Sequence, residues 1–97
     1  MRITYSPRAL RDLIEIGDYL SERSPSGTAR VEQRIRIVVE LIADFPASGR
    51  AVASRPTVRS IPLGVYPYWV FYTNLDDELI ILHIRHSARE PIDPSEL

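Results

Sequence analysis

The chain contains no cysteine and no lysine among its 97 residues. Without thiolates it cannot hold a thiolate-bound zinc ion or an iron–sulfur cluster, and it lacks the disulfides on which small secreted domains depend. All 12 of its cationic side chains are therefore arginine. Because arginine keeps its proton, chemistry that needs a deprotonated amine is excluded, whereas planar bidentate contacts to phosphate or carboxylate remain available.

Long apolar runs are also absent. No stretch approaches the roughly 20 apolar residues that a membrane span needs, and the N-terminus turns polar by Thr4 and Ser6. We therefore expect neither a membrane span nor a signal peptide, and we predict a cytoplasmic location. The length and the apolar content of 44% fit one soluble domain covering residues 1–97, with a tail that is loosely held from about residue 91.

The charges are balanced in number but unevenly placed. The formal net charge of −1 argues against a protein that coats nucleic acid over its whole surface. Between Phe45 and Leu75, however, there are three arginines and no acid, namely Arg50, Arg55 and Arg59. We interpret this stretch as a local positive patch. Acids in the first half alternate with arginines as on a solvated helix surface, and we assign them no function: Asp12, Glu15, Asp18, Glu22, Glu32 and Glu40.

Two helices are predicted from apolar residues that recur every three or four positions. Ser6 followed by Pro7 is typical of a helix start, and this helix should run to Ser21 or Glu22. Its predicted apolar stripe is Leu10, Leu13, Ile14, Gly17 and Leu20. The sequence Ser-Pro-Ser-Gly at 24–27 should break it, and a second helix should follow and close at Phe45. The predicted buried face of the second helix is Val31, Ile35, Val38, Ile42 and Phe45, widened by Ile37 and Leu41.

The second half of the chain changes to strand patterns. Residues 46–56 are small, polar or helix-breaking, which indicates a surface loop. Residues 58–61, 66–73 and 78–86 are rich in β-branched and aromatic side chains, and residues 74–77 form a hairpin turn between the last two. With a short strand at residues 2–5, the predicted order is β-α-α-β-β-β. This order predicts an α+β fold in which an antiparallel helix hairpin packs on one face of an antiparallel sheet.

Several segments in the same order resemble the ParE/RelE toxin family of type II toxin–antitoxin systems. They are residues 58–63 (VRSIPL), 66–72 (YPYWVFY) and 84–91 (IRHSAREP), together with the opening 5–9 (YSPRA) and the Phe45-Pro46 pair. The resemblance covers nearly the whole chain. It implies a cytoplasmic toxin, associated with plasmid stabilisation, that a neighbouring antitoxin holds inactive in a hetero-oligomer. The implied antitoxin is ParD-like with a ribbon-helix-helix domain, and the toxin reaches operator DNA only through it.

Members of this family divide by target. The resemblance implies either inhibition of DNA gyrase, as for ParE-type toxins, or cleavage of messenger RNA on the ribosome, as for RelE-type toxins. Ribonuclease members carry lysines, or a glutamate with a histidine, an arginine after a tyrosine on the middle strand, and often a tyrosine near the C-terminus. This chain has no lysine, places Trp69 after Tyr68, and has no tyrosine beyond Tyr72. We therefore favour a non-enzymatic, ParE-like gyrase inhibitor, with a RelE-like endoribonuclease as the alternative and a member that only binds its antitoxin as a third.

The candidate site residues follow from these two alternatives. For RNA cleavage, His86 is the one side chain among the candidates that could transfer a proton. For a protein target, the candidates are Arg59, Trp69, Arg85, His86 and Arg89. The resemblance suggests that the three arginines gather at one end of the sheet, where an acidic or phosphate partner would relieve their repulsion.

Two further questions concern side-chain orientation. Trp69 alternates with Phe71, so it belongs either to the core or to an open sheet face as a partner anchor. We expect no cofactor and no metal site, because His83 and His86 should point to opposite faces of one strand.

Apolar residues on the outer helix faces, including Ile16, Ile37 and Val39, predict a partner chain that covers them.

Overall fold

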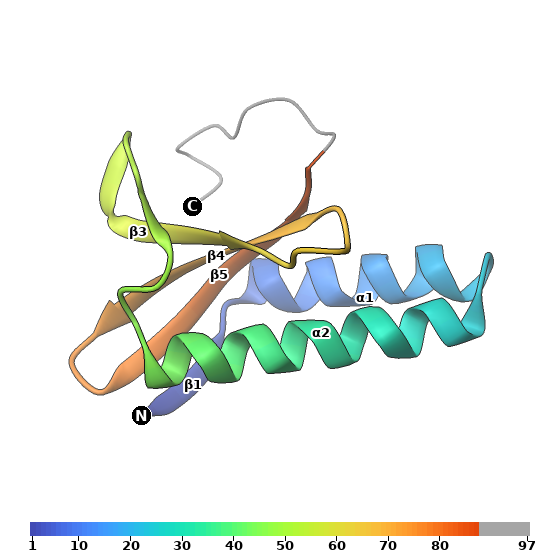
Figure 1. Cartoon of the computed structure of the whole chain (residues 1–97), viewed down its shortest axis with the longest axis horizontal. Helices are drawn as coiled ribbons and strands as arrows, with labels where there is room; N and C mark the ends of the chain where they lie inside the picture. The colour runs from blue at the N-terminus through green and yellow to red at the C-terminus, as the bar shows by residue number, and fades with distance from the viewer. Residues whose placement is uncertain (88–97) are drawn as a thin grey trace.

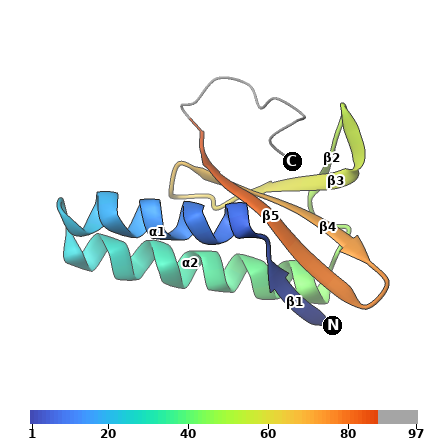
Figure 2. The same cartoon turned by 180° about the vertical axis from the view of Figure 1, so that it is seen from behind.

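The computed structural model describes residues 1–87. The elements in chain order are β1 (Arg2–Tyr5), α1 (Pro7–Ser21), α2 (Pro25–Asp44), β2 (Arg50–Val52), β3 (Arg55–Pro62), β4 (Tyr68–Leu75) and β5 (Glu78–His86). The five strands form one sheet in the order β1-β5-β4-β3-β2. Figure 1 and, from behind, Figure 2 show α1 and α2 side by side on one face of this sheet. The predicted α+β architecture is confirmed.

Two details of the sheet differ from the prediction. β1 pairs with β5 in parallel, and the other strand pairs are antiparallel. The segment predicted as a loop at 46–56 contains the three-residue strand β2, which pairs with β3. Its residues carry no alternating pattern, so β2 exists because β3 offers it an edge with unpaired backbone groups.

Both helices begin in the same way. The Ser6 side chain accepts a hydrogen bond from the backbone N–H of Ala9, and the Ser24 side chain accepts one from Gly27. A proline follows each serine and occupies the first helical position, where its missing N–H costs nothing. The sequence Ser-Pro-Ser-Gly, which we predicted as a break, therefore also starts α2.

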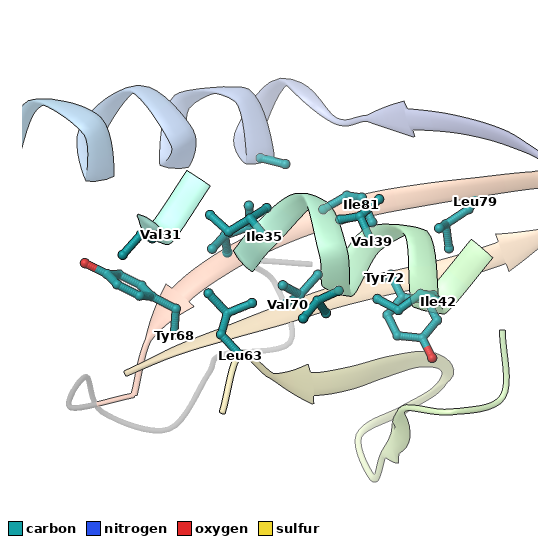
Figure 3. Packing of buried hydrophobic residues seen from close by; sticks show 13 residues of the cluster. Val31, Ile35, Val39, Ile42, Leu63, Tyr68, Val70, Tyr72, Leu79 and Ile81 are labelled. Atoms are coloured by element: carbon teal, nitrogen blue, oxygen red, sulfur yellow. The ribbon is translucent and has the colours of Figure 1, made fainter. Parts of the chain in front are cut away.

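The core lies between the helices and the sheet, as Figure 3 shows. Val31, Ile35, Val39 and Ile42 of α2 face Leu63, which follows β3, and the strand residues Tyr68, Val70, Tyr72, Leu79 and Ile81, and all ten are buried. Tyr68 and Leu63 lie beside Val31 at one end of this core, whereas Tyr72 lies beside Ile42 at the other end.

The predicted stripe of α1 is partly wrong. Leu13 and Leu20 pack against the core, but Leu10 is 50% exposed and Ile14 is 64% exposed. Ala9 and Asp12 are buried in their place. The helix is turned so that a carboxylate faces inward, which a count of apolar residues alone cannot reveal.

That carboxylate joins α1 to β5. β1 pairs with β5 only as far as Ile81, so the backbone N–H of Ile84 has no strand partner on that side. Asp12 Oδ2 accepts this N–H at 2.9 Å and lies 2.6 Å from Nδ1 of the buried His83, while Arg8 Nε donates to Asp12 Oδ1 at 3.2 Å. Because a carboxylate only accepts, Nδ1 of His83 is the donor.

The ionised form of Asp12 is stabilised by these donors. Burial alone would raise the pKa of the Asp12 carboxyl, but the hydrogen bonds from His83, Ile84 and Arg8 outweigh burial and hold the pKa below its ordinary value of 3.8. Asp12 is 5% exposed and His83 is 1% exposed, so water cannot replace either partner.

The connection from α2 to β2 is held by a second set of hydrogen bonds. The Tyr72 hydroxyl accepts from Gly49 N at 2.8 Å and donates to Pro46 O at 2.8 Å. Arg59 Nη1 donates to Gly49 O at 2.7 Å. A Cβ on Gly49 would lie 2.6 Å from the Tyr72 hydroxyl, so this close approach requires glycine.

We expect Asp12→Asn to lower the free energy of unfolding by about 1.5–3 kcal/mol at neutral pH, the range for a hydrogen bond to a charged group. The amide is uncharged and presents a single acceptor oxygen to three N–H donors. Because the folded pKa of Asp12 is lowered, its stabilisation is complete above its ordinary pKa of 3.8 and is lost as the pH falls through the folded value. Urea unfolding should therefore show a gap between wild type and variant that persists from about pH 7 to 5 and narrows below about pH 4.

Asp18→Asn is the matched control, because Asp18 lies on the same helix with an exposed side chain. Its unfolding free energy should stay within about 0.5 kcal/mol of wild type. Equal losses in the two variants, or a gap that widens in acid, would contradict the role given to Asp12.

Candidate functional site

Three of the candidate residues meet where β4 begins and β5 ends. Antiparallel pairing sets Trp69 opposite Arg85 and Tyr68 opposite His86. Trp69 is 37% exposed, whereas Tyr68 belongs to the buried core. Because successive side chains of a strand point to opposite faces, Trp69 and Arg85 share the open sheet face, and Tyr68 and His86 share the helix-covered face. The position of Trp69, which the sequence left open, is therefore on the open face.

The open face is well packed next to this pair. Phe71 and His83 lie opposite each other on β4 and β5, and their rings stack with centroids 5.9 Å apart and planes at 25°. Both side chains are buried, at 8% and 1% exposure. Trp69 and Arg85 thus project from a firmly packed part of the sheet. Binding a partner through them therefore costs little conformational entropy in the neighbouring side chains.

A pocket of about 410 Å³ lies at the same end of the sheet, between α1 and β5. This volume falls within the range of sites that bind small molecules or large side chains. Its lining residues are Asp12, Glu15, Ile16, Tyr19, Tyr68, Ile84, Arg85 and His86. The pocket therefore combines apolar and aromatic walls with two carboxylates, one arginine and one histidine.

The pocket offers hydrogen-bond donors and acceptors of different kinds. Burial raises the pKa of the Tyr68 phenol above 10.0, and the neighbouring Tyr19 adds to the effect. Tyr68 therefore stays protonated at neutral pH and can donate its hydroxyl proton in a hydrogen bond. The ring of His86 meets the Tyr68 ring edge-on, with centroids 5.2 Å apart, which fixes the imidazole against one wall of the pocket.

The structure separates Arg59 from this end of the sheet. Arg59 lies opposite Tyr72 on β4, three residues beyond Trp69, and its guanidinium is bonded to Gly49 O. Tyr72 faces the core whereas Trp69 faces outward, so Arg59 and Arg85 are on opposite faces of the sheet. The predicted gathering of Arg59 with Arg85 is therefore wrong, and Arg59 instead holds the loop after α2.

The remaining residues named in the sequence analysis are Arg89, His83 and His86. Arg89, the third arginine of the predicted cluster, lies outside the described residues, as does the tail predicted to be loosely held. His83 and His86 are both on β5, but only His86 lines the pocket. Within residues 1–87, no group of three or more His, Cys, Asp and Glu side chains is arranged to hold a metal ion. In the same range, no helix has both the length and the apolar character needed to cross a bilayer.

Sequence reasoning missed two acidic residues of this region. Asp12 and Glu15 were interpreted as part of a solvated helix surface. Asp12 is instead buried, whereas Glu15 is exposed as predicted, and both line the pocket. A signal was present for Asp12, because it lies three residues after Ala9 and four before Ile16 and so shares their helix face. For Glu15 no such signal exists, since the pocket forms only when α1 lies beside β5.

A separate exposed surface runs along α2. Ile37, Leu41 and Phe45 follow one another at intervals of four residues, so they share one helix face, and they are 47%, 44% and 63% exposed. We call these three residues the outer α2 stripe. Of the residues predicted to need a partner, Ile37 is exposed, but Ile16 and Val39 pack into the core. Phe45, predicted to be buried, and Leu41, predicted to widen the buried face, are exposed instead.

Relatives with similar sequences are described as toxins. The chain is 37% identical to Y4kP of Sinorhizobium fredii (strain NBRC 101917 / NGR234), a candidate toxin by its name, over 92% of this chain and 91% of that protein. It is 33% identical to toxin RelE2 of Caulobacter vibrioides (strain ATCC 19089 / CIP 103742 / CB 15), over 91% of this chain and 97% of that protein.

The fold is also known from a solved structure. A chain of the chromosomal ParDE toxin–antitoxin system from P. aeruginosa superposes with a TM-score of 0.76 and 23% identity, covering 89% of this chain and 95% of that chain. The family described as "ParE toxin of type II toxin-antitoxin system, parDE" matches residues 3–91. The chain therefore belongs to the ParE toxin family of type II toxin–antitoxin systems.

Proposed function

We propose that this toxin inhibits DNA gyrase by binding it, and that a ParD-like antitoxin with a ribbon-helix-helix domain neutralises it in the cytoplasm. Residues 1–97 act as one toxin domain, which reaches operator DNA only through the antitoxin and contributes to plasmid stabilisation. The observation that carries the proposal is the pairing of Trp69 with Arg85 on the open sheet face.

The chemistry of this pair favours binding to a protein. Trp and Arg are the residue types most enriched among the side chains that dominate interface energetics. The indole supplies a large rigid contact area, and the guanidinium can grip a carboxylate through two parallel hydrogen bonds. In the ribonuclease members of the ParE/RelE family, which the chain resembles, an arginine follows the tyrosine of the middle strand. Here Trp69 follows Tyr68 at that position. The open face thus offers an anchor where a phosphate-binding group would be needed for RNA cleavage.

We expect Arg85→Ala and Trp69→Ala each to relieve growth inhibition, because loss of an interface anchor costs on the order of 2–4 kcal/mol of binding free energy. The measurement is colony survival after induction, together with gyrase supercoiling in extracts. Arg11→Ala, at an exposed arginine of α1, is the control and should remain fully toxic. Undiminished toxicity of the Trp69→Ala, Arg85→Ala double variant would show that the target is bound elsewhere.

The pocket supports a second candidate function, ribosome-dependent cleavage of messenger RNA. Attack by a 2′-hydroxyl needs a base, an acid and a cation that stabilises the developing phosphorane charge. Glu15 and His86, two side chains that can transfer a proton, line one pocket, and Arg85, whose side chain projects from the other face of the sheet, borders it. The sequence had offered His86 alone for proton transfer.

The His86→Ala variant separates the two functions. A ribonuclease that loses its acid or base should become roughly 10²–10⁴-fold slower, whereas a gyrase inhibitor should keep most of its growth inhibition. Primer extension on messenger RNA after induction measures the first effect, and survival measures the second. Cleavage by the wild type that His86→Ala abolishes would replace gyrase inhibition with the second function.

The antitoxin is proposed to cover the outer α2 stripe. Three large apolar side chains in a row match the apolar face of an amphipathic helix. Arg30 lies seven residues before Ile37 and so extends the same face, and Asp44 lies three residues after Leu41 and borders it. A complementary antitoxin helix therefore carries an acid opposite Arg30 and a base opposite Asp44.

We expect Leu41→Asp to weaken antitoxin binding by about tenfold or more, because a carboxylate would be buried without a partner in the apolar contact. The variant should remain toxic and should no longer be rescued by the antitoxin. Co-purification and rescue of growth measure the two effects. Leu75→Asp, at the exposed apolar residue that ends β4, is the matched control. Normal rescue of the Leu41→Asp variant would place the antitoxin elsewhere.

A further inference from the structure

The β2–β3 hairpin carries the three arginines of the local positive patch. Arg50 lies in β2, and Arg55 and Arg59 lie in β3. Strand pairing sets Arg50 opposite Ser60 and Ala51 opposite Arg59, so the three cations belong to one short hairpin. We call them the hairpin arginines. Figure 1 and Figure 2 show this hairpin projecting at the edge of the sheet, away from both helices.

The positive charge of the hairpin arginines is not compensated within residues 1–87. None of the three forms an ion pair in this range. Arg59 donates to Gly49 O, but a carbonyl oxygen carries no net charge and takes only one N–H group of the guanidinium. The acids that flank this stretch in sequence are Asp44, at the end of α2, and Asp76, in the β4–β5 turn, and neither lies within ion-pair distance of these arginines.

A pocket of about 340 Å³ opens beside Arg59, at the end of β4. Among the described residues that line it, Arg59 is the only charged one. The hydroxyl of Thr57 and the side-chain amide of Asn74 also line the pocket and can donate hydrogen bonds, whereas the Thr73 hydroxyl already donates to Thr57 O at 2.8 Å. The pocket therefore offers an anion one positive charge and neutral donors, with no carboxylate in its wall.

Arg55 extends the cationic surface beyond the pocket. Side chains two residues apart on a strand project from the same face, so Arg55 and Arg59 share one face of β3, with Cα atoms roughly 13 Å apart. Arg50 projects from the other face, because it pairs with Ser60. A single small anion in the pocket would leave Arg50 unpaired. A nucleic-acid backbone carries negative charge at short regular intervals, so a backbone that runs along this edge of the sheet can reach all three cations.

We propose that the hairpin arginines bind the phosphate backbone of the DNA on which the toxin's target acts, with one phosphate in the pocket at Arg59. The inference rests on the proposed function, because gyrase acts on DNA. The contact is independent of base sequence, since arginine–phosphate pairs do not read base edges. It is also separate from the antitoxin surface, because the outer α2 stripe lies on a helix and the hairpin projects away from both helices.

The test measures binding of the purified full-length toxin to a fluorescein-labelled DNA duplex without the operator, by fluorescence anisotropy at several salt concentrations. For three arginine–phosphate contacts, log affinity should fall against log salt with a slope of about −2 to −3. Arg50→Ala and Arg55→Ala should each make this slope less steep by about 1. Arg11→Ala, at an exposed arginine of α1, is the matched control and should keep the wild-type slope.

Arg50 and Arg55 are chosen because Arg59 also holds the loop after α2. Both variants should co-purify with the antitoxin at the wild-type yield, which shows that they are folded. In a supercoiling assay with purified gyrase, both should require severalfold more toxin than wild type for equal inhibition.

A wild-type toxin that does not bind the duplex, or a slope that Arg50→Ala and Arg55→Ala leave unchanged, would overturn the inference. Loss of antitoxin binding in these two variants would overturn it by assigning the hairpin to the antitoxin. Inorganic phosphate that binds as tightly as the duplex would reduce the site to one small anion, and tighter binding of a single-stranded RNA of equal length would replace DNA with RNA. Toxicity without gyrase inhibition would refute the proposed target, while the anisotropy measurement still decides whether the hairpin binds DNA.

Discussion

The arrangement of helices and sheet depends on the buried carboxylate of Asp12. β1 accompanies β5 only to Ile81, and beyond that point α1 takes over the edge of β5, with Asp12 accepting the Ile84 N–H and the His83 ring N–H. A buried charge is tolerated when it is fully paired, and removal of its partners is costly. This contact sets the position of α1 relative to β5, and the pocket between them exists because of it.

Arginine has structural as well as functional roles in this chain. Arg59 closes the loop after α2, Arg34 holds the β3–β4 turn, and Arg8 pairs with Asp12. Each guanidinium donates a hydrogen bond to an oxygen acceptor within the fold. Its planar geometry makes these hydrogen bonds directional. Arginine can fill these structural roles because its guanidinium keeps its positive charge even where it is partly buried.

Family membership does not decide the target, because one fold carries different activities. Two surfaces at the same end of the sheet represent the two alternatives. The open face carries Trp69 and Arg85, which suit a protein partner, and the helix side carries a pocket with Glu15 and His86, which suits proton transfer. Arg85 borders both surfaces, so a change at this residue affects either function and cannot by itself separate them.

The sequence alone determined the order of the elements other than β2, the helix start at Ser6, the break between the two helices, the hairpin between β4 and β5 and the family. These features follow from local patterns of capping, periodicity and turn residues, which need no knowledge of distant contacts. Only the tertiary structure decided the side of the sheet that Trp69 faces, the separation of Arg59 from Arg85, and the burial of Asp12. Strand alternation defines two faces but not which one the helices cover, and strand register and helix rotation are set by packing between residues far apart in the chain.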